Sequence, residues 1–276
     1  MVQPALGSPP ASSTAAPSTG PDHAFGVGRV IARTFSAWWH HVLAFSLITL
    51  VAYLPLILLS LLGGMPVPGV TAPSAASFDP AAAPPTLPQG FWLAYSATML
   101  LFLVEVGAIT HGVINYLAGK PVSVGAMIAT GVRRLVPLIV VGILCYLLVV
   151  VGFVLLVVPG VILGCALAVA IPAVVVERPG VLGAIRRSFA LTKGKRFAIF
   201  VAFLVFLMVL MGVTMVGGFL LPQLTASFSP MLGTWLGLAV NVAFGTLLWV
   251  APGVVYHDLR VAKDGVSTAQ LVAVFE

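Results

Sequence analysis

The chain has 276 residues, of which 60% are hydrophobic and 7% are charged, and its formal net charge is +6. In soluble domains about a quarter of the residues are charged, so 13 basic and 7 acidic side chains are too few to cover a water-facing surface of this size. The composition therefore excludes an ordinary soluble domain. The apolar residues come in blocks of about twenty, the length needed to cross a bilayer, and they indicate an integral membrane protein.

Residues 1–24, "MVQPALGSPPASSTAAPSTGPDHA", are rich in Pro, Ala, Ser and Thr and contain no Lys or Arg. A secretory signal requires a basic start and a short apolar run, so this stretch is interpreted as a disordered tail. We therefore expect a disordered tail at 1–24, a membrane domain at 25–265 and a short cytoplasmic C-terminal tail at 266–276.

Six apolar segments follow along the chain, and each is a predicted membrane crossing. The third and fourth are separated only by Pro159 and Gly160, which we expect to end one helix and to permit a tight turn. The Pro/Ala-rich stretch 63–90 is expected to be an irregular external loop. The segments are 35–62, 91–118, 135–158, 161–176, 197–221 and 231–256.

The basic residues predict the orientation, because loops rich in Lys and Arg stay in the cytoplasm. All 13 lie before the first segment, between the second and third, between the fourth and fifth, or after the sixth. None lies in 63–90, at 159–160 or in 222–230. Both termini are therefore predicted to be cytoplasmic.

An internal repeat links the predicted cytoplasmic segments. "KPVSVGAM" at 120–127 aligns without gaps with "RPGVLGAI" at 178–185, and "FGVGRVIARTF" at 25–35 is similar more loosely. Apolar residues recur at helical spacing in the first copy, and Leu182, Ile185 and Phe189 form a stripe in the third. The sequence thus predicts an all-α membrane protein of six transmembrane helices in three hairpins, each preceded by a cytoplasmic amphipathic interfacial helix.

Three stretches carry a family resemblance: "VPGVIL" at 158–163, "ERPGVLGAIRRSFALTKGKRFAIF" at 177–200 and "YHDLRVAKDG" at 256–265. They resemble the glycerophosphoryl diester phosphodiesterase membrane domain family in its V-P-G turn, its R-S-aromatic-x-L-T-K-G segment and its terminal aromatic-x-D-L-R. The resemblance implies a six-helix, multi-pass domain of the bacterial cytoplasmic (inner) membrane. The family-typical residues are Pro159, Gly160, Glu177, Arg187, Ser188, Thr192, Lys193, Gly194, Asp258, Leu259 and Arg260.

The family name comes from members that join this membrane domain to a soluble phosphodiesterase barrel. Such a barrel needs about 250 residues, with metal-binding carboxylates and histidines, and the segments outside the predicted crossings hold no such cluster. We therefore expect no phosphodiesterase activity, no metal site and no cofactor in this chain.

Three polar residues inside predicted crossings are candidates for a special role. Glu105 lies near the middle of the second crossing, where an acidic group is costly and marks either a functional site or a hydrogen bond that fixes packing. We expect a neutral carboxyl there, with Asn241 of the sixth crossing as its best hydrogen-bond donor. His111 is interpreted as a packed histidine, because no further metal ligands surround it in the sequence.

Two main functional hypotheses follow. The first is a non-enzymatic module whose basic helices contact anionic lipid headgroups through Arg186, Arg187 and Lys193, or contact a partner membrane protein. The second is a transporter, channel or lipid-translocating protein that uses Glu105. An intramembrane enzyme using Glu105 and His111 is a weaker third, and nucleic-acid binding is not expected.

The orientation predicts that a Ser74→Cys variant, in a background lacking Cys145 and Cys165, reacts with a membrane-impermeant maleimide in intact cells. The thiol would be external because 63–90 contains no Lys or Arg. Labelling is measured before and after lysis. Reaction only after lysis would reverse the predicted topology.

Overall fold

The structure is a computed structural model that describes residues 25–63, 89–227 and 229–265. The predicted tails at 1–24 and 266–276 and nearly all of the predicted external loop lie outside the described residues. Within the described ranges the regular elements are helical, with no strand. They are α1 (Val27–Gly63), α2 (Gln89–Leu117), α3 (Val124–Arg133), α4 (Leu135–Leu155), α5 (Val157–Leu167), α6 (Ala170–Val176), α7 (Val181–Thr192), α8 (Arg196–Met215), the π-helix η3 (Val216–Leu220), α9 (Leu221–Thr225), α10 (Pro230–Gly245) and α11 (Leu247–Asp264).

Six helices or continuous helix runs among the described residues are long and apolar enough to cross a membrane. They match the six predicted segments in order, so the prediction of an all-helical, multi-pass membrane protein is confirmed. The runs are Val27–Leu59, Gly90–Leu117, Leu135–Leu155, Val157–Val176, Arg196–Thr225 and Trp235–Asp264.

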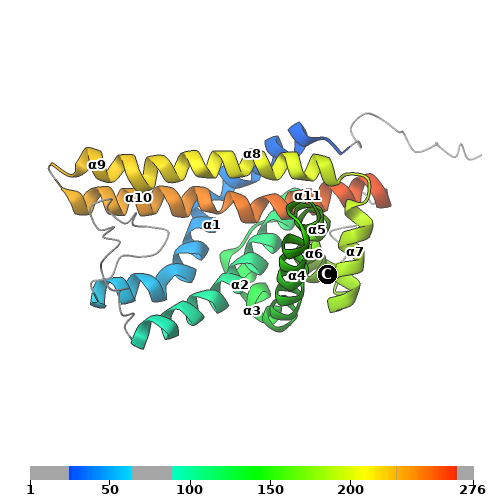
Figure 1. Ribbon diagram of the computed structural model, residues 1–276, viewed down its shortest axis with the longest axis horizontal. Coiled ribbons are helices and arrows are strands. Elements are labelled where there is room, and N and C mark those ends of the chain that lie inside the picture. Colours follow the sequence, from blue (N-terminus) through cyan, green and yellow to red (C-terminus); the bar gives the residue numbers. More distant parts are fainter. Residues whose placement is uncertain (1–24, 64–88, 228, 266–276) are drawn as a thin grey trace, which may run out of the picture.

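Two layers of helices make up the molecule (Figure 1). The run from α8 to α9 lies beside the run from α10 to α11 along the long axis, and α1 and α2 diverge from this pair toward the opposite side. The main core forms where α1, α2, α6, α7 and α11 meet, around fully buried side chains that include Phe45, Ile109 and Tyr256.

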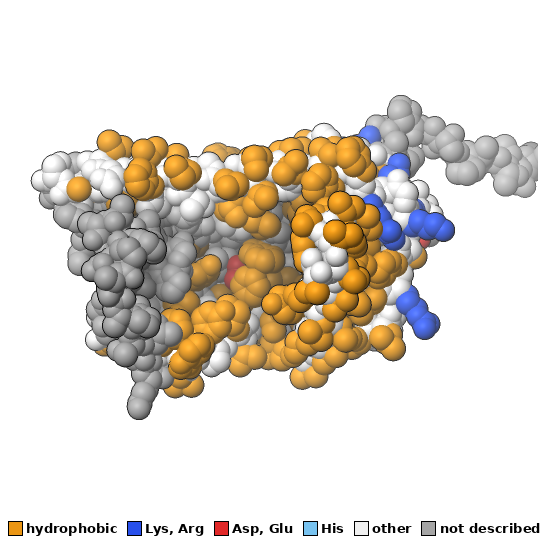
Figure 2. Space-filling model, in the orientation of Figure 1, with side chains coloured by type: hydrophobic (Ala, Val, Ile, Leu, Met, Phe, Trp, Pro, Cys, Tyr) orange, Lys and Arg blue, Asp and Glu red, His pale blue; other side chains and the backbone are white. Residues whose placement is uncertain are grey.

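The surface separates into an apolar body and a basic end. Large apolar side chains such as Leu147, Phe153 and Met211 are exposed on α4 and α8. In Figure 2 the orange apolar side chains cover most of the visible face, and the blue Lys and Arg side chains gather at one end. This distribution fits a body surrounded by hydrocarbon and an end in contact with headgroups and water.

The N-terminal segment that the sequence predicts to be an amphipathic interfacial helix is the first part of α1 and packs against the protein. α1 begins at Val27 and is kinked at His41, whose φ and ψ are −127° and 19°. On its inner side Val30 and Thr34 are fully buried, and the Trp38 indole donates to Ala243 O and to Thr246 Oγ1, each at 2.9 Å. The apolar side of this segment is therefore covered by protein and does not lie on the bilayer surface.

In α7 the side that packs against the protein differs from the apolar stripe of Leu182, Ile185 and Phe189 that the sequence predicts. The buried residues are Ala184, Ser188, Leu191 and Thr192. Leu182, which belongs to the predicted stripe, is 67% exposed. α7 therefore uses small and hydroxyl side chains to approach the bundle and leaves part of its stripe on the surface.

The turn between the third and fourth crossings comes earlier than the sequence predicts. Leu156, with φ −172° and ψ 156°, separates α4 from α5, so Pro159 and Gly160 lie in the first turn of α5. The prediction was wrong because proline in the first turn removes an N–H that has no intrahelical partner anyway. Gly160 lets α5 pack closely on α4, since a Cβ at this position would collide with the ring of Phe153.

Candidate functional site: an ion-pair cluster at the basic end

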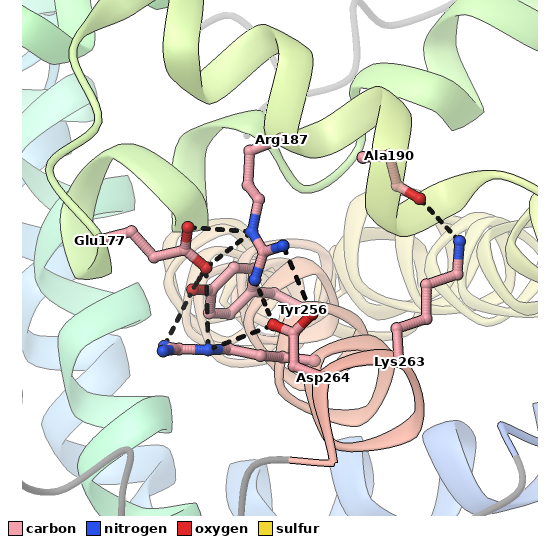
Figure 3. Close-up of polar contacts among 7 residues, drawn as sticks. Glu177, Arg187, Ala190, Tyr256, Lys263 and Asp264 are labelled. Atoms are coloured by element: carbon pink, nitrogen blue, oxygen red, sulfur yellow. Dashed lines mark hydrogen bonds and ion pairs between the residues drawn. The ribbon is translucent and has the colours of Figure 1, made fainter.

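Five polar side chains from three parts of the chain converge at the basic end, and we call them the end cluster. Glu177 follows α6, Arg187 lies on α7, and Tyr256, Arg260 and Asp264 lie on α11 (Figure 3). The three α11 residues are spaced by four, so they stack along one side of that helix.

Arg187 joins the two carboxylates of the end cluster. Its Nε lies 3.0 and 2.9 Å from the two oxygens of Glu177, and its terminal nitrogens contact Asp264. Burial alone lowers the pKa of Arg187, but the hydrogen bonds and charges of Asp264 and Glu177 outweigh it and hold this pKa above its ordinary value. A planar guanidinium suits this role because it can present two edges to two carboxylates.

Tyr256 and Arg260 complete the cluster. The fully buried Tyr256 donates its hydroxyl to Glu177 Oε1 at 2.7 Å and accepts from Arg260 at 3.3 Å. Arg260 Nε is 3.7 Å from Glu177 and 3.8 Å from Asp264, which is an ion-pair distance rather than a hydrogen bond. Two guanidinium groups thus face two carboxylates, and the cluster is neutral overall.

Lys263 holds the C-terminal end of α7. Its ammonium donates to Ala190 O at 2.6 Å (Figure 3). It also donates to Lys193 O at 2.8 Å. The last carbonyls of a helix have no intrahelical donor, and a cation there also complements the helix dipole. The chain then turns at Gly194, whose φ of +82° is a conformation that glycine adopts easily.

Ser188 and Thr192 contact the C-terminal end of the neighbouring helix α5. The Ser188 hydroxyl donates to Ala166 O at 2.7 Å, and Thr192 Oγ1 lies 3.3 Å from the same oxygen. Ala166 is in the last turn of α5, which ends at Leu167, so its carbonyl needs a donor from outside the helix. Ser188 and Thr192 therefore anchor α7 to α5.

Asp258 forms a separate contact toward α1. Its Oδ1 is 2.5 Å from Arg33 and 3.3 Å from His257 Nδ1. The Asp258 side chain is 4% exposed, whereas that of Arg33 is 42% exposed. This ion pair fixes the start of α1 to α11.

The structure thus brings Glu177, Arg187 and Arg260 together, and the other residues of the predicted motif make separate contacts. Leu259 is fully buried in the core, and Pro159 and Gly160 lie in the first turn of α5. Tyr256 and Asp264 lie in the stretch 256–265 that the resemblance singles out, but the sequence predicted no role for them, although their spacing of four from Arg260 was an available signal.

Of the residues predicted to contact lipid, Arg186 and Lys193 are exposed. Arg187 is committed to Glu177 and Asp264, and its side chain is only 27% exposed. A headgroup would have to compete with two carboxylates for this guanidinium.

Glu105 lies far from the end cluster in the sequence and has a different environment. It is 1% exposed, and the Thr49 hydroxyl lies 2.6 Å from its Oε1. The expected donor, Asn241, instead donates to Gly237 O at 2.9 Å, so that pairing was wrong. The Asn241 amide lies beside Gly217 of η3, at the point where the backbones of Gly217 and Gly237 approach closely.

His111 contacts Asn115, one turn further along α2, with 3.0 Å between Nε2 and the amide nitrogen. In the described ranges no group of three or more His, Cys, Asp or Glu residues is placed to hold a metal ion. The contact between His111 and Asn115 joins successive turns of α2.

Fold and polar contacts together define an all-helical, multi-pass membrane protein with a charged cluster at one end and a buried acid in its body. No family model, curated protein or solved structure matches the chain.

The end cluster predicts a large difference between two adjacent arginines. Arg187→Gln leaves two partly buried carboxylates with one guanidinium, so we expect a loss of about 1–3 kcal/mol in the free energy of unfolding. Arg187→Lys should recover only part of it, because an ammonium cannot present two edges. The matched control is Arg186→Gln, on the exposed side of α7, which should be near neutral. Thermal unfolding in detergent measures all three, and equal melting of the Arg186 and Arg187 variants would contradict a stabilising role.

Proposed function

We propose that this chain is a non-enzymatic membrane module of the bacterial cytoplasmic membrane, which contacts anionic lipid headgroups through the basic residues near α7. The proposal includes the arrangement inferred from the sequence, with three transmembrane hairpins and both termini in the cytoplasm. It also includes the resemblance to the glycerophosphoryl diester phosphodiesterase membrane domain family, without that family's catalytic barrel and without its activity.

The observation that carries this proposal is the position of the basic side chains. Lys and Arg gather at one end of an otherwise apolar body (Figure 2), which is the level of the headgroups if the body spans the bilayer. Arg186 and Lys193 are exposed there, beside the exposed Leu182. A surface with cations next to an apolar side chain suits an anionic lipid, whose phosphate and acyl chain are close together.

The end cluster supports the same proposal indirectly. Because Arg187 and Arg260 are paired with Glu177 and Asp264, they supply rigidity rather than free charge. α7 is held to α11 by these pairs and by Lys263, so its exposed cations keep a defined position. We therefore restrict the lipid-contact hypothesis to Arg186 and Lys193 and assign Arg187 to the framework.

We expect Arg186→Gln together with Lys193→Gln to weaken retention of anionic lipid by about 1 kcal/mol per residue. Native mass spectrometry of protein from mixed phosphatidylglycerol and phosphatidylethanolamine micelles measures the retention. Arg187→Gln is the control, expected to lower stability without the same loss of lipid. Unchanged retention in the double variant would exclude lipid contact at these residues and favour a partner membrane protein.

A second candidate function is transport or lipid translocation, and one observation favours it. A cavity of about 220 Å³ lies between α1, α2, α8, α10 and α11, and Thr49, which contacts Glu105, is part of its lining. Binding sites of transporters commonly lie inside the membrane, where polar groups meet a cavity.

The comparison of Glu105→Gln with Glu105→Leu separates the two functions. If Glu105 only fixes packing, Gln keeps shape and hydrogen bonding and retains function, whereas Leu lowers stability because the hydrogen bond between Thr49 of α1 and residue 105 of α2 is lost. If Glu105 carries a titratable proton, Gln remains stable but inactive. Thermal stability in detergent and the cellular phenotype of gene deletion are the two measurements. A stable, inactive Gln variant would reject packing as the sole role of Glu105.

A further inference from the structure

The cavity in the body of the molecule has a mixed lining, in which four side chains offer polar groups to water. Thr49, Tyr53, Thr214 and Asn241 contribute hydroxyl and amide groups, beside aromatic rings such as that of Trp249. A cavity of about 220 Å³ with several polar partners is large and polar enough to hold water, whereas purely apolar cavities stay dry. Figure 2 shows a hollow in the apolar face between the α8–α10 layer and the α1–α2 pair, with an acidic side chain visible inside it.

Thr49 stands between this cavity and Glu105. Its side chain lines the cavity, and its Oγ1 is 2.6 Å from Glu105 Oε1 and 3.1 Å from Phe45 O. A hydroxyl has a single proton to donate, so Thr49 cannot donate to both oxygens at once. Which oxygen receives it depends on whether Glu105 carries a proton.

Both protonation states of Glu105 fit the same heavy-atom positions. With a protonated carboxyl, Glu105 donates to Thr49 Oγ1 and Thr49 donates to Phe45 O. With an ionised carboxyl, the Thr49 hydroxyl rotates and donates to Glu105 Oε1. The other carboxyl oxygen, Oε2, is buried and has no hydrogen-bond partner among the described residues, so the protein supplies a single donor for a negative charge at this position.

We propose that Glu105 is a proton-binding site that exchanges its proton with water in the cavity through the Thr49 hydroxyl. A hydronium ion in the cavity gives a proton to Thr49 Oγ1 while the proton already on Thr49 passes to Glu105 Oε1, which leaves neutral water and a neutral carboxyl. Release is the same pair of transfers in reverse. This inference deepens the second candidate function and is independent of the lipid-contact proposal.

The test is hydrogen–deuterium exchange of the carboxyl, followed by infrared spectroscopy of the detergent-solubilised full chain after mixing with D₂O. The carbonyl stretching band of a protonated carboxyl shifts on deuteration, and its absence in Glu105→Gln identifies the band of Glu105 among those of other acids. In the wild type the band should be present and should shift rapidly. In Thr49→Val, which keeps the shape but removes the hydroxyl, exchange should slow by more than roughly tenfold, equivalent to about 1.4 kcal/mol of added barrier.

A second variant tests the cavity independently of Thr49. Gly245 lines the cavity, and a Cβ built on it meets no atom within 4 Å, so Gly245→Leu fills the cavity without a clash at Cβ and should also slow exchange. The matched control is Thr110→Val. Thr110 is 1% exposed on the same helix as Glu105, and its hydroxyl donates to Val106 O at 2.8 Å without lining the cavity. Exchange in this control should equal that of the wild type.

Two results would overturn the inference. The first is the absence of any protonated-carboxyl band that Glu105→Gln removes, which means that Glu105 is ionised. The second is rapid exchange in both Thr49→Val and Gly245→Leu, which means that the proton takes another route. Because exchange is measured without transport, normal exchange combined with an unaffected cellular phenotype of Glu105→Gln would reject the second candidate function and keep the proton site.

Discussion

Hydrocarbon offers no hydrogen-bond partner, so each polar group within the six spans must find one inside the protein or remain costly. This constraint explains which helices are neighbours in the structure. The free carbonyl of Ala166 brings α5 to Ser188 of α7, and the Trp38 indole brings α1 to the junction of α10 and α11. Apolar contact alone would leave these helices free to slide, because lipid tails are as apolar as their side chains.

The end cluster applies the same constraint to charge. Taking an arginine partly out of water is costly unless carboxylates and further hydrogen bonds surround it. Arg187 meets this condition with Glu177 and Asp264, and Tyr256 donates to Glu177 from the buried side. The cluster therefore specifies one arrangement of α6, α7 and α11, whatever net stability it contributes.

The sequence predicted the helical class and the number of crossings because both depend on local composition. Hydropathy adds up along a segment, and a span of about twenty apolar residues is sufficient evidence by itself. The direction of an amphipathic side was harder to predict. Val30 and Trp38 mark an apolar side of α1, but the pattern cannot say whether bilayer or protein covers it, and in the structure protein does.

In the candidate sites too, local sequence patterns identified single residues but not the partners that packing brings to them. Glu177, Arg187 and Arg260 were singled out by a motif and do meet in space, but the free lipid contact expected of Arg187 overlooked two carboxylates that lie ten residues before it and 77 residues after it. Glu105 was recognisable as an acid in an apolar run. Its partner was not, because a single Thr49 in another apolar run carries no signal and the pairing arises only when α1 packs against α2.

α11 connects the two sites and makes the molecule asymmetric. Near its start Leu248 and Trp249 line the cavity, and near its end Tyr256, Arg260 and Asp264 form the end cluster. Ion pairs hold this helix to α7 and α1, so its position is fixed from the basic end. On the opposite wall of the cavity α8 continues into the π-helix η3, where Gly217 packs on Gly237 through backbone contacts. π-helical turns often accompany functional sites, and small residues let two helix backbones approach closely. The cavity is therefore bounded on one side by a helix that ion pairs hold at the basic end, and on the other by α8 and α10, which meet through η3 in a close glycine contact.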